Sequence, residues 1–168
     1  MTRFAADVID TVLGIAEGSP LDQLRARRPE ARARTQSSYA VLFNPPDPGG
    51  LSPPERFAVA LRVASLNDAT ALAAHYRARL AGEAGGAALA AAIDAGAPSR
   101  AITPRAQAML RHAELAATNP SAASALDLDT LSAEGLTAAE IVTLSQIIAF
   151  VAYQVRVAAS LALIAGTP

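Results

Sequence analysis

The stretch that decides the fold covers residues 51–76 and reads LSPPERFAVALRVASLNDATALAAHY. Near its start, Ser52 is followed three residues later by Glu55, with two prolines between them. That spacing fits a capping box, in which the hydroxyl and the carboxylate satisfy the free N–H groups at the start of a helix. The polar pair Asn67-Asp68 then fits the cap of a following helix. The stretch predicts a helical hairpin over residues 53–81.

Similar helix starts recur along the chain. Thr137 and Glu140 fit a second capping box, and Pro20 and Pro104 each follow a hydroxyl residue that can cap a helix. No segment shows the sustained alternation of apolar and polar residues that is typical of strands. We therefore predict an all-α protein, with a short helical turn near 127–133 and helices near 4–15, 20–28, 29–43, 53–66, 68–81, 86–95, 104–117 and 138–164.

A proline- and glycine-rich loop, residues 44–50, is the clearest break in this pattern. The helices before it are short and would bury little surface on their own. We predict an N-terminal helical extension, residues 1–49, docked on a core of residues 50–168.

The composition of the chain excludes several classes of function. The chain has 168 residues, of which 52% are hydrophobic, and a net charge of −1, which argues for a globular domain without a nucleic-acid-binding surface. It contains no cysteine, which excludes disulfides and thiolate metal sites. His112 has no second ligand at helical spacing, so we expect no metal site and no cofactor. The first residues do not have the pattern of a secretory signal, and we expect a cytoplasmic protein.

The last predicted helix is apolar over residues 141–164, long enough to raise the question of a membrane span. Polar residues interrupt it, so we interpret it as a buried helix of a soluble protein and expect no membrane partner. Its apolar residues occupy opposing faces, which predicts burial nearly all round. A domain of this size would leave one face uncovered, so we expect a homo-oligomer. Candidate contacts are Phe150, Val157 and Ile164.

Residues 51–76 resemble the core segment of alkylhydroperoxidase D and its relatives in the carboxymuconolactone decarboxylase-like family. There, a helix opening Leu-Ser/Thr-Pro-x-Glu leads through Ala-Asn-Gly to Cys-x-x-Cys and then to histidines. Residues 135–156 are similar to the pattern of the peroxidase-related branch, Gly-Leu-Ser/Thr-x-x-Glu-Ile-Val followed by Ile-x-x-Phe-x-x-Tyr-x-x-Arg. The resemblance covers residues 50–164. It implies an alkylhydroperoxidase D-like helical fold and assembly as a trimer or hexamer.

In active relatives, a glutamate, two cysteines and a histidine form a proton relay that activates a thiolate. The relay spacing falls here on Phe57, Ala69, Leu72 and Tyr76, which we call the relay positions. All four are replaced, so dithiol peroxidase activity is not expected and no catalytic residue is assigned. Glu55 is not the relay glutamate, because its place in the capping box accounts for it.

The residues that could still form a pocket are Asn67, His75, Tyr76 and Arg62. His75 is either a general base in a remodelled pocket or a histidine at the helix surface or a subunit contact, and the second interpretation is favoured because no carboxylate or second histidine accompanies it. Two functions stay open. The first is a non-redox structural or ligand-binding protein that assembles with itself or with a cysteine-containing paralogue. The second is an enzyme of decarboxylase or isomerase type, which would act on a small organic acid in the retained cavity without thiols.

Overall fold

The structure is a computed structural model that describes residues 7–96 and 100–166. Within these residues the chain is helical and contains no strand, which confirms the predicted all-α class. The short α1 and α2 and the 3-10 turn η1 (Pro120–Ala122) accompany seven longer helices. The α-helices are α1 (Val8–Leu13), α2 (Pro20–Ala26), α3 (Pro29–Phe43), α4 (Pro53–Leu66), α5 (Thr70–Ala81), α6 (Gly86–Ala95), α7 (Pro104–Thr118), α8 (Ala125–Ala133) and α9 (Ala138–Ala165).

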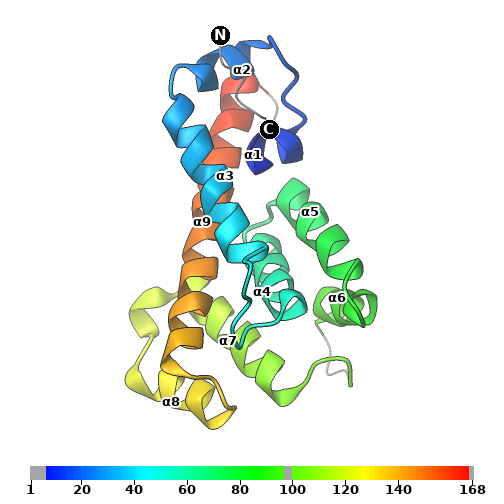
Figure 1. Ribbon diagram of the computed structural model, residues 1–168, viewed down its shortest axis with the longest axis vertical. Helices are drawn as coiled ribbons and strands as arrows, with labels where there is room; N and C mark the ends of the chain where they lie inside the picture. Colours follow the sequence, from blue (N-terminus) through cyan, green and yellow to red (C-terminus); the bar gives the residue numbers. More distant parts are fainter. Residues whose placement is uncertain (1–6, 97–99, 167–168) are drawn as a thin grey trace.

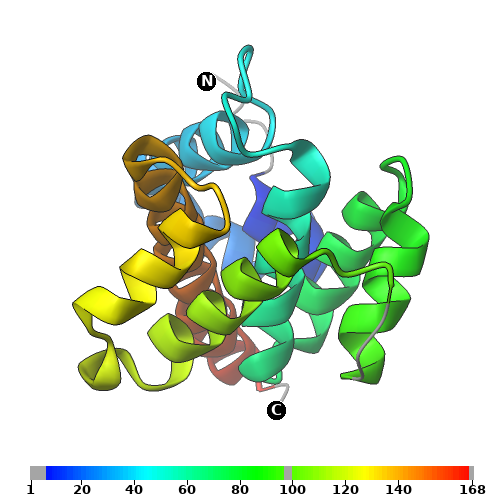
Figure 2. The ribbon, with the colours of Figure 1, turned by 90° about the horizontal axis from the view of Figure 1, so that it is seen from below.

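The long helix α9 runs through most of the length of the molecule (Figure 1). The N-terminal helices α1 to α3 lie beside its C-terminal half, and α4 to α8 gather around its first half. Helix α4 lies at the centre of this second group, where it packs against α5, α7 and α9 (Figure 2). Its apolar residues are almost fully buried, so the hairpin predicted from residues 53–81 forms the middle of the core.

The two predicted capping boxes are present, and one arginine forms hydrogen bonds to both of them. Glu55 Oε2 accepts from the Ser52 backbone N–H at 2.8 Å, and Glu140 Oε2 accepts from the Thr137 N–H at 2.6 Å. The guanidinium of Arg105, on α7, bonds to the other oxygen of each glutamate at 2.9 Å. One arginine thus joins the N-termini of α4 and α9, and Glu55 has the structural role that its position in the sequence predicts.

The loop before α4 is held by a buried cation. Arg56 donates to three backbone carbonyls, those of Leu51 at 2.9 Å, Leu42 at 2.7 Å and Pro48 at 2.6 Å. The arginine is 5% exposed. The carbonyls of Pro48 and Leu51 lie in the loop and that of Leu42 in the last turn of α3, where carbonyls have no partner within the helix, so Arg56 supplies the donors that the backbone lacks.

A buried ionic cluster holds the N-terminal helices together. Arg25 forms ion pairs with Asp7, at 2.7 Å, and with Asp10. Arg32 reaches Asp10 at 3.1 Å and Asp22 at 2.6 Å. Asp7 and Asp10 are almost fully buried, so the cluster satisfies charges that would be costly to bury alone.

Two details of the hairpin differ from the prediction. Helix α5 begins at Thr70, its cap residue is Ala69, and no side chain caps it. Asn67 instead ends α4, where its amide donates to the Val63 carbonyl at 2.9 Å, and Asp68 adopts a left-handed backbone with φ 54°. The prediction that Asn67-Asp68 caps the second helix was therefore wrong. The tight turn between α4 and α5 uses these residues to change direction, which prevents their side chains from reaching the N-terminus of α5.

The inner face of α9 is the one that the sequence predicts. Leu144, Ile147, Ile148 and Val151 are buried against the core. Within the single chain the cover of α9 is partial, because Val142 is 57% and Ile164 62% exposed. Burial of this outer face by a second subunit stays a prediction. Helix α9 is long and apolar enough to cross a membrane by length and composition, and 33% of its most apolar window is buried inside the molecule.

Phe150 also differs from its prediction as a contact residue. It is 9% exposed and its ring lies 6.4 Å from that of Phe43 on α3. The helical wheel placed it opposite the main apolar face, but α3 packs on that side of α9 and covers it. Phe150 therefore belongs to the core of the single chain.

Candidate functional site

The relay positions lie inside the protein. Phe57 and Tyr76 are fully buried, Leu72 is 1% exposed, and Ala69 packs against the core from the start of α5. Aromatic rings close the space between the first two. Phe43 stacks on Phe57 with ring centroids 5.4 Å apart and lies 5.1 Å from Tyr76. The space between the four relay positions is therefore filled with side chains.

Tyr76 makes one buried polar contact. Its hydroxyl donates to Gln154 Oε1 on α9 at 2.5 Å. Burial raises the pKa of Tyr76 well above its usual value, with a further rise from nearby Tyr39, against the opposing effect of the bond to Gln154. The phenol is thus a hydrogen-bond donor and not a base. Gln154 is fully buried and its Nε2 has no partner, so the pair joins α5 to α9 with one amide group unsatisfied.

His75 lies half-buried on the same helix, beside Tyr76. Its Nε2 is 2.9 Å from the hydroxyl of Tyr39 on α3, and its ring meets that of Tyr76 edge-on at 5.1 Å. Burial and the charge of Arg79 both lower the pKa of His75, and burial raises that of Tyr39. A neutral imidazole that shares a hydrogen bond with a neutral phenol is therefore favoured at pH 7.

Arg79, one turn beyond His75, completes this group. Its guanidinium lies 5.0 Å above the Phe57 ring, a cation–π arrangement, and Nη2 bonds to Asn44 Oδ1 at 2.8 Å. The side chain is exposed. We call Tyr39, His75 and Arg79 the α3–α5 triplet. It is a proton-carrying pair beside a cation, at the edge of the filled relay region.

The predicted pocket does not assemble as a whole. His75 and Tyr76 are in contact, but Asn67 is an exposed helix end and Arg62 forms an ion pair with Glu114 on α7 at 2.6 Å. Arg62 is therefore directed toward α7, and Arg79 is the arginine that approaches His75. Among residues 7–96 and 100–166, no group of three or more His, Asp or Glu side chains is placed to hold a metal ion.

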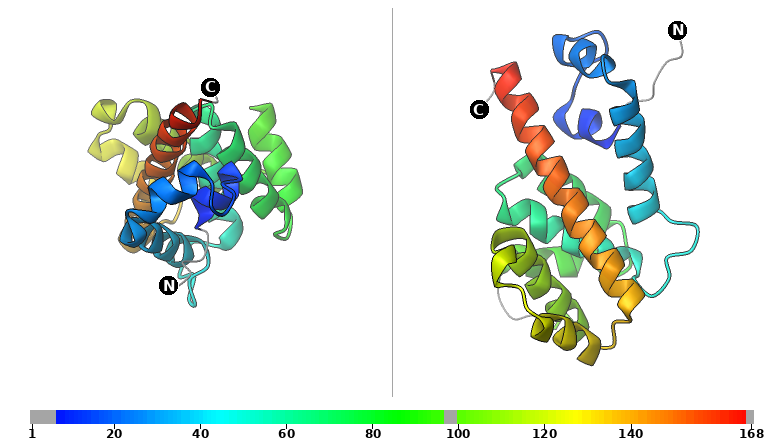
Figure 3. Two further views of the ribbon diagram at one scale, coloured as in Figure 1. Left: turned by 90° about the horizontal axis from the view of Figure 1, so that it is seen from above. Right: turned by 90° about the vertical axis from the view of Figure 1, so that its left-hand side faces the viewer.

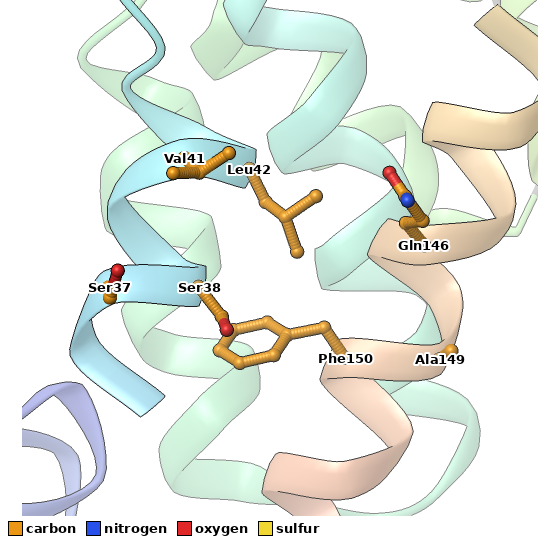
Figure 4. A pocket seen from close by; sticks show the side chains of 7 residues that line it. All are labelled: Ser37, Ser38, Val41, Leu42, Gln146, Ala149 and Phe150. Atoms are coloured by element: carbon orange, nitrogen blue, oxygen red, sulfur yellow. The ribbon is translucent and has the colours of Figure 1, made fainter. Parts of the chain in front are cut away.

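A surface groove lies between α3 and α9, with a volume of about 430 Å³. Leu42 and Phe150 extend into the space between the two helices and form its floor (Figure 4). Ser38, Gln146 and Ala149 lie along its sides. The hydrogen bond between Thr35 and Tyr153, at 2.9 Å, joins the same two helices further along.

Two residues of this region, Tyr39 and Gln154, are not among those predicted from the sequence. Tyr39 lies four residues after Thr35 and four before Phe43, a spacing that places all three on one face of α3. Gln154 is a polar residue on the otherwise apolar inner face of α9. Both signals were present in the sequence, but the partners, His75 and Tyr76, are too distant along the chain to be assigned from spacing.

Comparison with known proteins supports the fold. No protein-family model matches the sequence, and no curated protein matches it. Among solved structures, the chain is similar to an uncharacterized peroxidase-related protein from Silicibacter sp. TM1040, with a TM-score of 0.71 and 22% sequence identity. The match covers 84% of this chain and 74% of that one. The protein thus has a peroxidase-related all-α fold, and at this identity the likeness carries no statement about chemistry.

Proposed function

We propose that the protein is a non-redox member of the alkylhydroperoxidase D-like group, which keeps the fold and acts by binding and assembly. One observation carries this proposal. The side chains at Phe57, Leu72 and Tyr76 fill the place of the relay, so a hydroperoxide has neither a thiolate to react with nor space to enter. The chain has no cysteine elsewhere to replace the missing pair.

The surface of α9 supports the assembly part of the proposal. Apolar residues such as Val142 and Ile164 are exposed on a helix whose other face forms the core. The outer face of α9 thus offers apolar side chains to a partner, and exposed apolar surface that is contiguous marks interaction sites. The partner is another copy of the chain, in a closed trimer or hexamer, or a cysteine-containing paralogue of the same fold.

A second function is favoured by the α3–α5 triplet. An enzyme of decarboxylase or isomerase type needs a group that moves a proton next to a group that holds an acid. The hydrogen-bonded Tyr39 and His75 fit the first role, and the exposed guanidinium of Arg79 fits the second. Arg62, one of the candidate pocket residues, is paired with Glu114 instead.

Two measurements test the proposal. The metal-free protein should not reduce an organic hydroperoxide with a dithiol reductant, and Ala69→Cys/Leu72→Cys should restore at most weak turnover, because Phe57 and Tyr76 leave the thiolate without an acid–base partner. Strong turnover by the double variant would contradict the non-redox proposal.

The second measurement is a thermal-shift series with small mono- and dicarboxylates. A stabilisation that Arg79→Gln abolishes and Arg77→Gln retains would favour the enzyme instead, since Arg77 on the same helix is paired with Asp94 at 2.7 Å.

A further inference from the structure

The large exposed apolar side chains of the described residues lie on a few helices. In the described part of the chain, each large hydrophobic residue with substantial exposure lies on α9 or on α2, α3 or α8, which pack against α9. The helices α4 to α7 carry none in that part. These residues are Leu24, Val41, Leu126, Leu128, Val142, Tyr153, Leu163 and Ile164.

The outward residues of α9 follow a regular pattern. Starting from Val142, they recur after four, three and four residues as far as Tyr153, and then again after four, three and four as far as Ile164. At about 100° per residue these positions fall on one side of a helix. We call them the α9 stripe: Val142, Gln146, Ala149, Tyr153, Val157, Ser160 and Ile164. All are exposed except Val157, which is half-buried. Figure 3 (right) shows α9 at the front of the molecule along its whole length.

The spacing of the stripe is the same in both directions from Tyr153, and so is its chemistry. Val142 and Ile164, both apolar, lie eleven residues on either side. Gln146 and Ser160, both polar, lie seven residues away, and the small Ala149 is matched by the branched Val157 at four. A surface that is symmetric along a helix is complementary to itself when a second helix runs in the opposite direction.

We infer that the α9 stripe pairs with the α9 stripe of a second copy, antiparallel, with a two-fold axis at Tyr153. This inference rests on the proposed role in assembly and specifies its partner and geometry. The partner is a second copy, and of the two proposed closed assemblies the hexamer can contain the contact, because a closed trimer has no two-fold axis. Val142 then meets the partner's Ile164, Gln146 meets the partner's Ser160, and Ala149 meets the partner's Val157. The contact is isologous, the commonest symmetry of soluble oligomers.

The α3–α9 groove fits the same arrangement. It opens beside Ala149, the level at which an antiparallel partner presents Val157, and its floor of Leu42 and Phe150 is apolar. If the partner's Val157 enters the groove, it is shielded from water, and so are Leu42 and Phe150 beneath it. The groove and the stripe are thus parts of one surface.

Charge favours antiparallel over parallel pairing. Arg156 is exposed at the edge of the stripe and carries its only formal charge. A parallel pair would bring two copies of Arg156 to the same level. In the antiparallel pair they lie on opposite sides of the axis, about 9 Å apart along the helices, near the Debye length at physiological salt.

The length of the α9 stripe indicates how tightly two copies should associate. From Val142 to Ile164 it measures about 33 Å, which corresponds to about three heptads of a coiled coil. A single helix face of that length is smaller than a standard interface of about 800 Å² per partner, so the flanking Val41, Leu126 and Leu163 must contribute. We expect a reversible dimer in the micromolar range or a two-fold contact within a larger assembly.

The absence of native cysteine allows a direct test on the full chain. We would prepare Val142→Cys and Ile164→Cys, one of them with an affinity tag, and join them with a short bismaleimide. The antiparallel pair predicts crosslinking between the two variants when mixed. Each variant alone should not crosslink to itself, because the two copies of the same residue would lie about 33 Å apart in the antiparallel pair. The background level is measured with Gln107→Cys, an exposed position on α7.

Light scattering on the wild-type protein and on Ala149→Arg distinguishes a failure of the assembly proposal from a failure of the antiparallel pairing. Ala149 is exposed, so the variant should keep its helical content and lose the dimer mass, whereas Gln107→Arg should keep both. A wild type that stays monomeric at concentrations well above the micromolar range would overturn this pairing and self-assembly, so that the proposed function would require the paralogue as partner. An oligomer in which Val142→Cys crosslinks to itself, or in which no crosslink forms, would overturn the pairing alone. A monomer that binds anionic vesicles through Val142 and Ile164 would assign the stripe to a membrane surface and overturn it as well.

Discussion

The α4–α5 hairpin and the outer face of α9 are both built from apolar residues, yet the protein closes the first and leaves the second open. In the hairpin, Phe57, Leu72 and Tyr76 are almost completely buried. On α9, Val142 and Ile164 face solvent. The buried hairpin therefore contributes to stability, while the apolar surface that is available for interaction lies on α9. Changes in the hairpin should therefore alter folding, and changes on α9 should alter association.

The largest effect is expected from Phe57→Glu, which introduces a glutamate at the position that the family resemblance assigns to the relay. It would place a carboxylate among aromatic rings, and we expect a cost of about 4 kcal/mol in the free energy of unfolding, even though the Arg79 guanidinium lies 5.0 Å from the ring that is replaced. Phe57→Leu, the matched control, should cost about 1–2 kcal/mol, because it removes only part of a buried apolar side chain. Urea unfolding followed by circular dichroism measures both. Nearly wild-type stability of Phe57→Glu would mean that the hairpin keeps a site able to accept the charge.

Arg56→Met tests whether the loop before α4 depends on its buried cation. The variant keeps the length of the side chain but leaves the carbonyls of Leu42, Pro48 and Leu51 without their donor, so we expect a loss of about 2–4 kcal/mol. Arg79→Met, a more exposed arginine near the same hairpin, should cost much less. Equal losses in the two variants would contradict the assignment of Arg56 as the anchor of the loop.

The Tyr76–Gln154 pair should give an intermediate effect. Tyr76→Phe leaves the Gln154 amide without its partner, and we expect a loss of about 1–3 kcal/mol. Tyr76→Phe/Gln154→Leu removes both polar groups and should recover part of that loss, because no buried amide remains unsatisfied. A double-mutant cycle from chemical unfolding measures the coupling. Additive losses would show that the two side chains do not interact.

The smallest effect is expected from the titration of His75. Burial holds its pKa below the ordinary 6.5, so the unfolded chain binds a proton before the folded chain does. The contribution of neutral His75 to the free energy of unfolding is therefore fully present above the ordinary pKa and is lost as the pH falls below it. Between about pH 7.5 and about pH 5.5, the wild type should lose more stability than His75→Gln. His112→Gln is the matched comparison, since burial also lowers the pKa of His112. An equal pH slope in wild type and His75→Gln would contradict the buried, neutral state of His75.

The sequence was sufficient for the parts of the fold that depend on local chemistry. Capping boxes marked the starts of α4 and α9, and helical periodicity identified the inner face of α9. The sequence was not sufficient where contacts between segments far apart in the chain determine the structure. Phe150 is covered because α3 packs on its side of α9, and Asn67 ends α4 because the chain turns there. The Tyr39–His75 bond joins residues 36 positions apart, a contact that no local pattern contains.

The most direct test of the sealed hairpin is the reactivity of a single thiol placed at Leu72, in a chain that has no other. Leu72→Cys lies at a position that is 1% exposed, whereas Ala71→Cys, next to it on α5, faces solvent. Labelling with an aromatic disulfide in native buffer should be slower by orders of magnitude at Leu72→Cys than at Ala71→Cys, and the two rates should become equal in denaturant. Equal native rates would mean that the relay region is open to solvent and would contradict the account.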